Sequence, residues 1–176
     1  MTGSPRAKGN SNALAEEFIK AAQESGNIVN RIDAANSGVT GCIACDTCWN
    51  QGVPCSVDDH FNKIAPLIQQ ADVYVFVFPL YWYSIPAQIK AVIDKMYCLG
   101  SSKSPTSLKD KEYIVIVSGE ESKEKAYQGT LKSFESIADF LHWTEQNRLI
   151  AGGLGPVGAV ETSPYLAQAF EMGKNI

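Results

Sequence analysis

Two unbroken apolar runs limit this chain to few architectures. Residues 73–78 read Val-Tyr-Val-Phe-Val-Phe, and residues 113–117 read Tyr-Ile-Val-Ile-Val. Strands that are apolar at every position are typical of the centre of a parallel sheet, where helices cover both faces. Helical patterns alternate with these runs, at about 11–25, 61–68, 85–96, 131–141 and from 163 onward, and shorter strands are indicated at 27–33 and 149–150. The alternation predicts one α/β domain over residues 1–176, an open parallel sheet flanked by helices on both faces.

The composition argues against several classes of partner. The 176 residues carry a net charge of −4 and no block of Lys or Arg, which disfavours nucleic acid and anionic membranes. No apolar run is long enough to cross a bilayer and no signal-peptide pattern opens the chain, so we expect a cytoplasmic protein. In that compartment the five cysteines are expected as thiols or metal ligands rather than disulfides.

Ligands of open parallel sheets bind beyond the carboxyl ends of the strands, where we expect loops 3–12, 79–84 and 118–129. The first loop reads Gly-Ser-Pro-Arg-Ala-Lys-Gly-Asn-Ser-Asn and opens a helix. Helix N-termini and successive backbone N–H groups attract anions, and an arginine adds a full positive charge. The pattern predicts a phosphate site at Ser4, Arg6, Ser11 and Asn12; the alternative is an ordinary helix cap after a flexible terminus.

The second loop contains three consecutive aromatic residues, Tyr81, Trp82 and Tyr83. They cannot all face the core, so some must present a flat surface to solvent or to a flat ligand. The alternative is a lid over the core edge or a dimer contact. In the third loop Gly119 would let the backbone approach a ligand closely, whereas residues 121–125 are expected to form a solvated turn.

Four of the five cysteines follow the spacing Cys42-x2-Cys45-x2-Cys48-x6-Cys55 within an irregular stretch. Four thiolates in one short loop can hold an iron–sulfur cluster or a zinc ion. The alternative is a set of half-buried free thiols at a subunit contact. The fifth, Cys98, lies at the end of a helix and is expected as a small buried apolar residue.

The three loops contain no Ser/His/Asp set and no paired carboxylates. Asp58 and Asp59 precede a helix and are interpreted as capping residues. We therefore predict no catalytic side chain in these loops.

These motifs together resemble the NADPH-dependent FMN reductase superfamily, whose fold is flavodoxin-like, over nearly the whole chain. Gly-Ser-Pro-Arg…Gly-Asn-Ser at residues 3–11 is similar to its FMN-phosphate loop, and residues 79–95 are similar to its flavin-edge loop and following helix. The compact cysteine motif resembles that of the iron–sulfur flavoprotein branch, in which four cysteines hold a 4Fe–4S cluster.

The resemblance implies an oxidoreductase with FMN as cofactor and NAD(P)H as co-substrate, which passes reducing equivalents to an unidentified acceptor. It also implies a homodimer, and a possible 4Fe–4S cluster on Cys42, Cys45, Cys48 and Cys55. An iron–sulfur electron carrier and a non-enzymatic FMN- or metal-binding module are the alternatives. The implied FMN contacts are Ser4, Arg6, Ser11 and Asn12 for the phosphate, Pro79, Leu80, Tyr81, Trp82, Tyr83 and Ser84 for the isoalloxazine ring, and Ser118 and Gly119 for its other side or edge.

The chain departs from the family at its first strand. In the family a buried central strand leads into the Gly-Ser-Pro loop, whereas only Met1 and Thr2 precede Gly3 here. We therefore expect the first strand to be truncated or the sheet to be rearranged, and the phosphate loop to lose its anchor.

Overall fold

The computed structural model describes all residues from 1 to 176, and its helices and strands alternate as predicted. The sheet consists of β1 (Val73–Pro79), β2 (Glu112–Ser118) and β3 (Thr144–Ala151). The helices are α1 (Asn10–Glu24), α2 (Phe61–Gln70), α3 (Ala87–Lys95), α4 (Tyr97–Gly100), α5 (Gln128–Leu141) and α6 (Tyr165–Lys174), with short 3-10 helices η1 (Glu124–Tyr127) and η2 (Ala159–Thr162).

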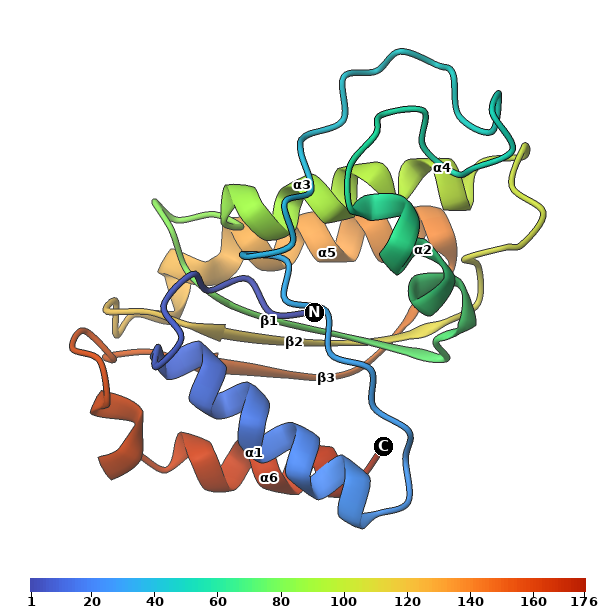
Figure 1. The fold of residues 1–176 in the computed structure, drawn as a ribbon. Coiled ribbons are helices and arrows are strands. Elements are labelled where there is room, and N and C mark those ends of the chain that lie inside the picture. The colour runs from blue at the N-terminus through green and yellow to red at the C-terminus, as the bar shows by residue number, and fades with distance from the viewer.

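All three strands are parallel and follow one another in the order β1-β2-β3. Helices α1 and α6 cover one face of the sheet, and α2, α3, α4 and α5 cover the other (Figure 1). Pro79 lies opposite Ser118, and Ser118 lies opposite Ala151, so the strands end together at one edge. No helix is both long and apolar enough to cross a membrane.

Residues 1–3 take the position of the family's first strand. Thr2 forms parallel bridges with both Val77 and Asp33. The Thr2 N–H donates to the Ile32 carbonyl at 2.8 Å and the Gly3 N–H donates to the Val77 carbonyl at 2.9 Å. The expected loss of the anchor is therefore wrong, because backbone bonds on both sides hold the start of the phosphate loop.

Each face of the sheet has its own apolar core. The larger cluster lies between the sheet and α2–α5, where the rings of Phe76 and Phe134 are 4.8 Å apart and the Trp143 indole N–H donates to the Leu108 carbonyl. The smaller cluster lies against α1 and α6. These two cores confirm the prediction of a sheet covered on both faces.

Two strands differ from their predicted extents. The polar residues 144–148 form the first part of β3, an exposed edge strand whose composition shows no apolar run. Residues 27–33 form no regular strand, and only Asp33 bridges to Thr2. The apolar pattern in the sequence therefore located the buried strands correctly but not the edges.

Candidate functional site

Four loops meet at the edge where the strands end, on the left in Figure 1. They follow Gly3, Pro79, Ser118 and Ala151, and the first three are the loops predicted from the sequence. In parallel α/β sheets this edge is where ligands bind, so we describe it loop by loop.

The first loop, residues 4–12, is curled tightly by hydrogen bonds of its own side chains, and we call this loop the cup. The Ser4 hydroxyl, which is buried, accepts a hydrogen bond from the Arg6 N–H at 3.3 Å, and the Asn12 amide donates to the Arg6 carbonyl at 2.9 Å. Gly9 completes the cup, since a Cβ there would lie 2.9 Å from the Ser4 hydroxyl. Only glycine leaves room for Ser4 at this point.

The cup retains free donors of the kind that bind phosphate. The Ser11 hydroxyl is buried and has no hydrogen-bond partner, and no side chain caps the N-terminus of α1. The Arg6 side chain is exposed and makes no ion pair with any carboxylate. The predicted phosphate residues Ser4, Arg6 and Ser11 thus gather at a helix N-terminus that fits an anion.

Asn12, the fourth predicted phosphate residue, is engaged within the protein. Its amide nitrogen is bonded to the loop carbonyls, and its amide oxygen accepts from the Arg31 guanidinium at 3.3 Å. In this structure Asn12 shapes the cup and offers no free donor.

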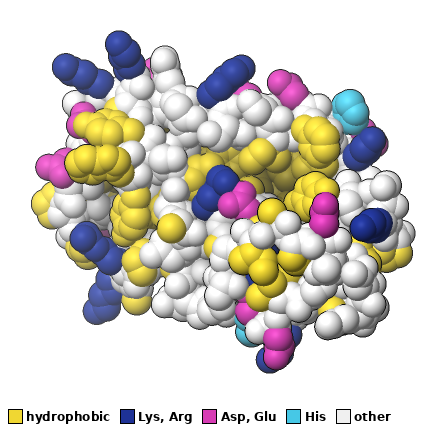
Figure 2. Space-filling view, turned by 90° about the horizontal axis from the view of Figure 1, so that it is seen from above, with side chains coloured by type: hydrophobic (Ala, Val, Ile, Leu, Met, Phe, Trp, Pro, Cys, Tyr) yellow, Lys and Arg dark blue, Asp and Glu magenta, His cyan; other side chains and the backbone are white.

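The aromatic loop forms a two-residue hairpin turn. Tyr81 and Ser84 exchange backbone hydrogen bonds of 3.1 and 2.9 Å, and Trp82 and Tyr83 have φ values of 47° and 61°. Positive φ at both central residues defines a type I′ turn, which usually contains Asn and Gly. The turn holds Trp82 93% exposed, which confirms that the aromatic residues do not all face the core. Apolar side chains gather at this end of the molecule in Figure 2.

The third loop is tied to the aromatic turn. The Tyr83 hydroxyl donates to the Glu121 carboxylate at 3.1 Å, a bond that raises the pKa of Tyr83. The buried Tyr127 donates its hydroxyl to the Glu121 carbonyl at 2.7 Å. A Cβ at Gly119 would lie 2.7 Å from that Tyr127 hydroxyl, so Gly119 is required here for packing within the protein. Ser118 is buried, and its carbonyl accepts from the Leu80 N–H at 2.7 Å.

The sequence analysis missed the fourth loop, residues 152–158, and its attachment to Asn10. The Asn10 amide donates to the carbonyls of Leu154 and Pro156 at 3.3 and 2.8 Å. Its oxygen accepts from the N–H groups of Gly158 and Val160 at 3.0 and 3.4 Å. The signals available in the sequence were the glycines of this loop and the asparagine at the first turn of a helix.

The four motif cysteines line one cavity of about 440 Å³, together with Asp94 and Tyr97. Cys42 and Cys45 are exposed, and Cys48 and Cys55 are partly buried. The Thr47 hydroxyl lies 2.9 Å from the Cys45 sulfur and lowers the pKa of that thiol. No three His, Cys, Asp or Glu side chains converge as the ligands of a single ion do. Four cysteines are the residue types that ligate an iron–sulfur cluster, but in this structure their side chains line one cavity without converging on a metal site.

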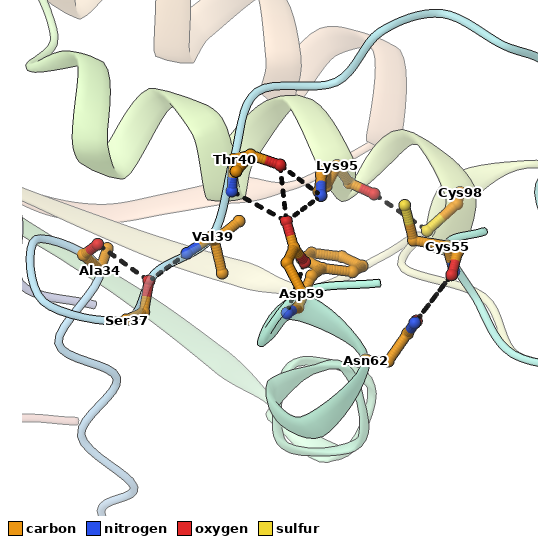
Figure 3. Close-up of polar contacts among 10 residues, drawn as sticks. Ala34, Ser37, Val39, Thr40, Cys55, Asp59, Asn62, Lys95 and Cys98 are labelled. Carbon is orange, nitrogen blue, oxygen red and sulfur yellow. Dashed lines mark hydrogen bonds and ion pairs between the residues drawn. The ribbon is translucent and has the colours of Figure 1, made fainter. Parts of the chain in front are cut away.

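A buried ion pair closes the cysteine loop at its base (Figure 3). Lys95 of α3 pairs with Asp59, and their side chains are 1% and 7% exposed. The same Asp59 oxygen accepts from the N–H and the hydroxyl of Thr40, each at 2.8 Å. Since Thr40 precedes Cys42 and Asp59 follows Cys55, the pair fixes both ends of the loop to α3.

The sequence predicted Asp58 and Asp59 as a capping pair; the N-cap is His60, and of the two carboxylates only Asp59 bonds to the start of α2, where its other oxygen accepts from the Phe61 N–H at 2.9 Å. Burial opposes ionisation of this carboxyl, but the hydrogen bonds from Lys95, Thr40 and Phe61 outweigh it and lower its pKa to about 2. The sequence gave no signal for the pairing with Lys95, which is 36 residues away.

Cys98 lies beneath the cysteine loop. It is buried, as predicted, and burial raises its pKa to about 12. Its carbonyl accepts from the Trp49 indole N–H at 2.9 Å, so the middle of the loop is attached to α4. Figure 2, which views the molecule from this side, shows a hollow lined with apolar side chains and charges of both signs around it.

Comparisons with known proteins agree with this architecture. The chain is 30% identical over 159 residues to an iron-sulfur flavoprotein of Archaeoglobus fulgidus, covering 90% of this chain and 64% of that protein. It superposes on an NAD(P)H:quinone oxidoreductase from Methanothermobacter marburgensis with a TM-score of 0.76 at 19% identity, covering 99% and 92% of the two chains. It also superposes on an FMN-dependent NADH-azoreductase from Bacillus anthracis str. Ames Ancestor, solved with FMN, with a TM-score of 0.69 at 17% identity, covering 99% and 95%.

The family model described as "flavodoxin-like fold" matches residues 1–171, nearly the full length of the chain. The α/β architecture, the loops gathered at the carboxyl edge and this match agree, and they confirm the resemblance that the motifs indicated. The chain therefore belongs to the flavodoxin-like fold family.

Proposed function

We propose that this protein is an FMN-dependent oxidoreductase that passes reducing equivalents from NAD(P)H to an acceptor. The observation that carries the proposal is the unpartnered Ser11 hydroxyl, buried at the uncapped N-terminus of α1. A cup with spare donors suits the phosphate of FMN, and the exposed aromatic turn at the same edge suits a flat ring. The FMN-dependent azoreductase and the iron-sulfur flavoprotein named above support this choice of cofactor.

In this proposal the flavin supplies hydride chemistry when it is bound, and the protein binds and orients it. Ser4, Ser11 and the first N–H groups of α1 hold the phosphate, and Arg6 neutralises its charge. The turn from Tyr81 to Ser84 lines the ring. Its position is fixed by the bond from Tyr83 to Glu121 and by the bond from the preceding Leu80 to Ser118 of β2. No side chain of the four loops has to act as an acid or base.

We also propose that the protein acts as a homodimer in which the partner helps to close the flavin site. Its support is Trp82, which is 93% exposed beside that site. Light scattering on purified protein would measure the mass, and a monomer at all concentrations would contradict it.

The test of FMN binding distinguishes the contribution of the phosphate to affinity from that of the ring. Arg6→Ala should weaken FMN binding by about ten- to hundredfold, the range of a charge-assisted hydrogen bond, and leave riboflavin binding unchanged. Lys8→Ala, an exposed cation in the same loop, is the matched control. Equal losses for FMN and riboflavin would contradict the role of Arg6.

Bleaching of bound FMN by NADPH or NADH under anaerobic conditions would measure the reductase activity.

The cysteine-lined cavity favours a second candidate, an iron–sulfur flavoprotein that carries electrons. In it Cys42, Cys45, Cys48 and Cys55 would hold a 4Fe–4S cluster, and that cluster would supply one-electron chemistry. Iron analysis after anaerobic purification tests it: about four irons per chain support a cluster, and less than one iron per chain contradicts it. Zinc in colourless protein that takes up no FMN would instead indicate a non-enzymatic module.

A further inference from the structure

A buried side-chain amide engages the carbonyl groups of the cup. Asn12 is 6% exposed, and its amide nitrogen donates to the carbonyls of Arg6 and Ala7 at 2.9 and 3.5 Å. The Arg6 carbonyl also accepts from the Gly9 N–H at 2.8 Å, and the Gly9 carbonyl accepts from the Ala13 N–H at 3.1 Å. Three carbonyl groups of the cup are thus bonded to donors of the protein itself.

Most N–H groups of the cup have no such partner. Between residues 4 and 12, only the N–H groups of Arg6 and Gly9 donate to another group of the protein. A loop whose carbonyls are engaged and whose N–H groups are free attracts anions. Asn12 therefore contributes to the charge preference of the cup from behind, by holding the carbonyls away from the ligand.

Arg31 determines which way the Asn12 amide points. The Arg31 guanidinium donates to the Asn12 amide oxygen at 3.3 Å and also pairs with Glu16, one helical turn further along α1. If the amide were turned over, its NH2 group would face a cation and its oxygen would face two carbonyl oxygens. If the guanidinium were absent, the buried amide oxygen would have no partner, which is costly. The observed orientation of Asn12 thus depends on Arg31.

We propose that Arg31 is a positioning residue for the phosphate site, an inference that rests on the proposed function. Arg31 acts through Asn12, which is 19 residues away in the sequence. The guanidinium fixes the amide, the amide engages the carbonyls of the cup, and the free N–H groups of the cup bind the phosphate of FMN. Loss of Arg31 therefore weakens the binding of a ligand that carries a phosphate and not of one that lacks it.

The first test compares FMN with riboflavin on Arg31→Met, which keeps the length of the side chain and removes its donors and its charge. FMN should bind about tenfold more weakly, because a buried polar group loses its partner, and riboflavin should bind as it does to the wild type. Calorimetric titration of the flavin-free protein measures both affinities. Equal losses for the two ligands would indicate a general structural role and would overturn the proposal.

The matched control is Glu16→Gln, which removes the other partner of Arg31 and leaves its bond to Asn12. Glu16 is 63% exposed in its side chain, so little else should change. This variant should bind FMN as the wild type does. A loss as large as that of Arg31→Met would overturn the proposal, because the ion pair on the surface of α1 would then explain the effect.

A double-mutant cycle tests whether Arg31 acts through Asn12. In the background of Asn12→Leu, which already lacks the amide, Arg31→Met should weaken FMN binding by less than about twofold. The full tenfold loss in that background would show that Arg31 attracts the phosphate by its charge alone, and this would overturn the proposal. Should Asn12→Leu fail to fold, the amide exchange described next decides the question.

Amide exchange in the flavin-free protein, followed by NMR, separates this inference from the proposed function. Arg31→Met should speed the exchange of the Gly9 N–H, whose acceptor is the Arg6 carbonyl held by Asn12, by about fivefold or more and leave the amides of β2 unchanged. Unchanged exchange at Gly9 would overturn the proposal. Absence of FMN binding by the wild type would contradict the proposed function, whereas the exchange at Gly9 would still decide whether Arg31 fixes the cup.

Discussion

Lys95 and Asp59 form an ion pair that is almost completely buried, and this pair joins α3 to both ends of the cysteine loop. Helix α3 directly follows the aromatic turn, because Ile85 and Pro86 are the only residues between Ser84 and Ala87. The pair therefore links the base of the cysteine cavity to the helix that follows the proposed flavin-binding turn.

Lys95→Met should lower the free energy of unfolding by about 3 kcal/mol, because it leaves a buried carboxylate without its cation. Urea denaturation measures the change. Lys90→Met is the matched control on the same helix: Lys90 pairs with Asp94 at 2.5 Å, both are 44% exposed, and the expected loss is below about 0.5 kcal/mol. Equal effects of the two substitutions would show that the buried pair does not contribute as described.

Asp59 makes stability dependent on pH in the acid range. Its pKa is about 2 in the folded protein, below the usual 3.8, so the ionised carboxylate stabilises the fold above pH 4 and this contribution is lost as the pH falls toward 2. The shift corresponds to about 2 kcal/mol. Urea unfolding of the wild type and Asp59→Asn at pH 5 and pH 2.5 should give a difference that shrinks at the lower pH. A difference independent of pH would contradict this pKa.

The thiols should react in an order set by their exposure. Cys42 and Cys45 are exposed, whereas Cys98 is buried and its pKa is raised to about 12 by that burial. In cluster-free protein at pH 7.5, iodoacetamide should modify Cys42 and Cys45 first and Cys98 only after unfolding. Peptide mass spectrometry against time measures the order. Early alkylation of Cys98 in folded protein would show that the cysteine loop moves away from α4 and exposes Cys98.

Trp82→Asn should stabilise the protein and weaken FMN binding. Asn adopts positive φ more readily than Trp, so relief of the strained turn should raise the free energy of unfolding by about 0.5–1 kcal/mol. Little apolar burial is lost, since Trp82 is 93% exposed. Thermal denaturation and FMN titration measure the two effects. Unchanged FMN affinity would remove Trp82 from the proposed ring site.

The buried strands could be predicted because burial on both faces leaves an apolar run, as in β1 and β2. The first half of β3 could not, because an exposed edge strand carries polar residues. Residues 27–33 have an apolar pattern but form no regular strand, and the backbone pairing there is confined to residues 32–34, which bond to Thr2. The apolar pattern therefore identifies buried segments, but whether such a segment forms a strand depends on a neighbouring segment with which it can pair.

Within the candidate site, the sequence predicted the loops better than their internal bonds. The loop of residues 4–12 could be located because its residues are adjacent in sequence, and its role as a phosphate site stays a prediction. The ion pair of Lys95 and Asp59 could not, because it joins segments far apart along the chain. The type I′ turn at Trp82 and Tyr83 could not either, because neither residue is typical of positive φ.

The side chain of Asn10 uses every hydrogen-bonding position it has: two amide protons and two lone pairs, all directed to residues 154–160. Aspartate would lose both protons, and serine or leucine would leave most of these positions vacant. Asparagine is thus the single short side chain that can attach the start of α1, through hydrogen bonds at all four positions, to a segment more than 140 residues later. The cup and the loop after β3 are consequently held together by this one side chain.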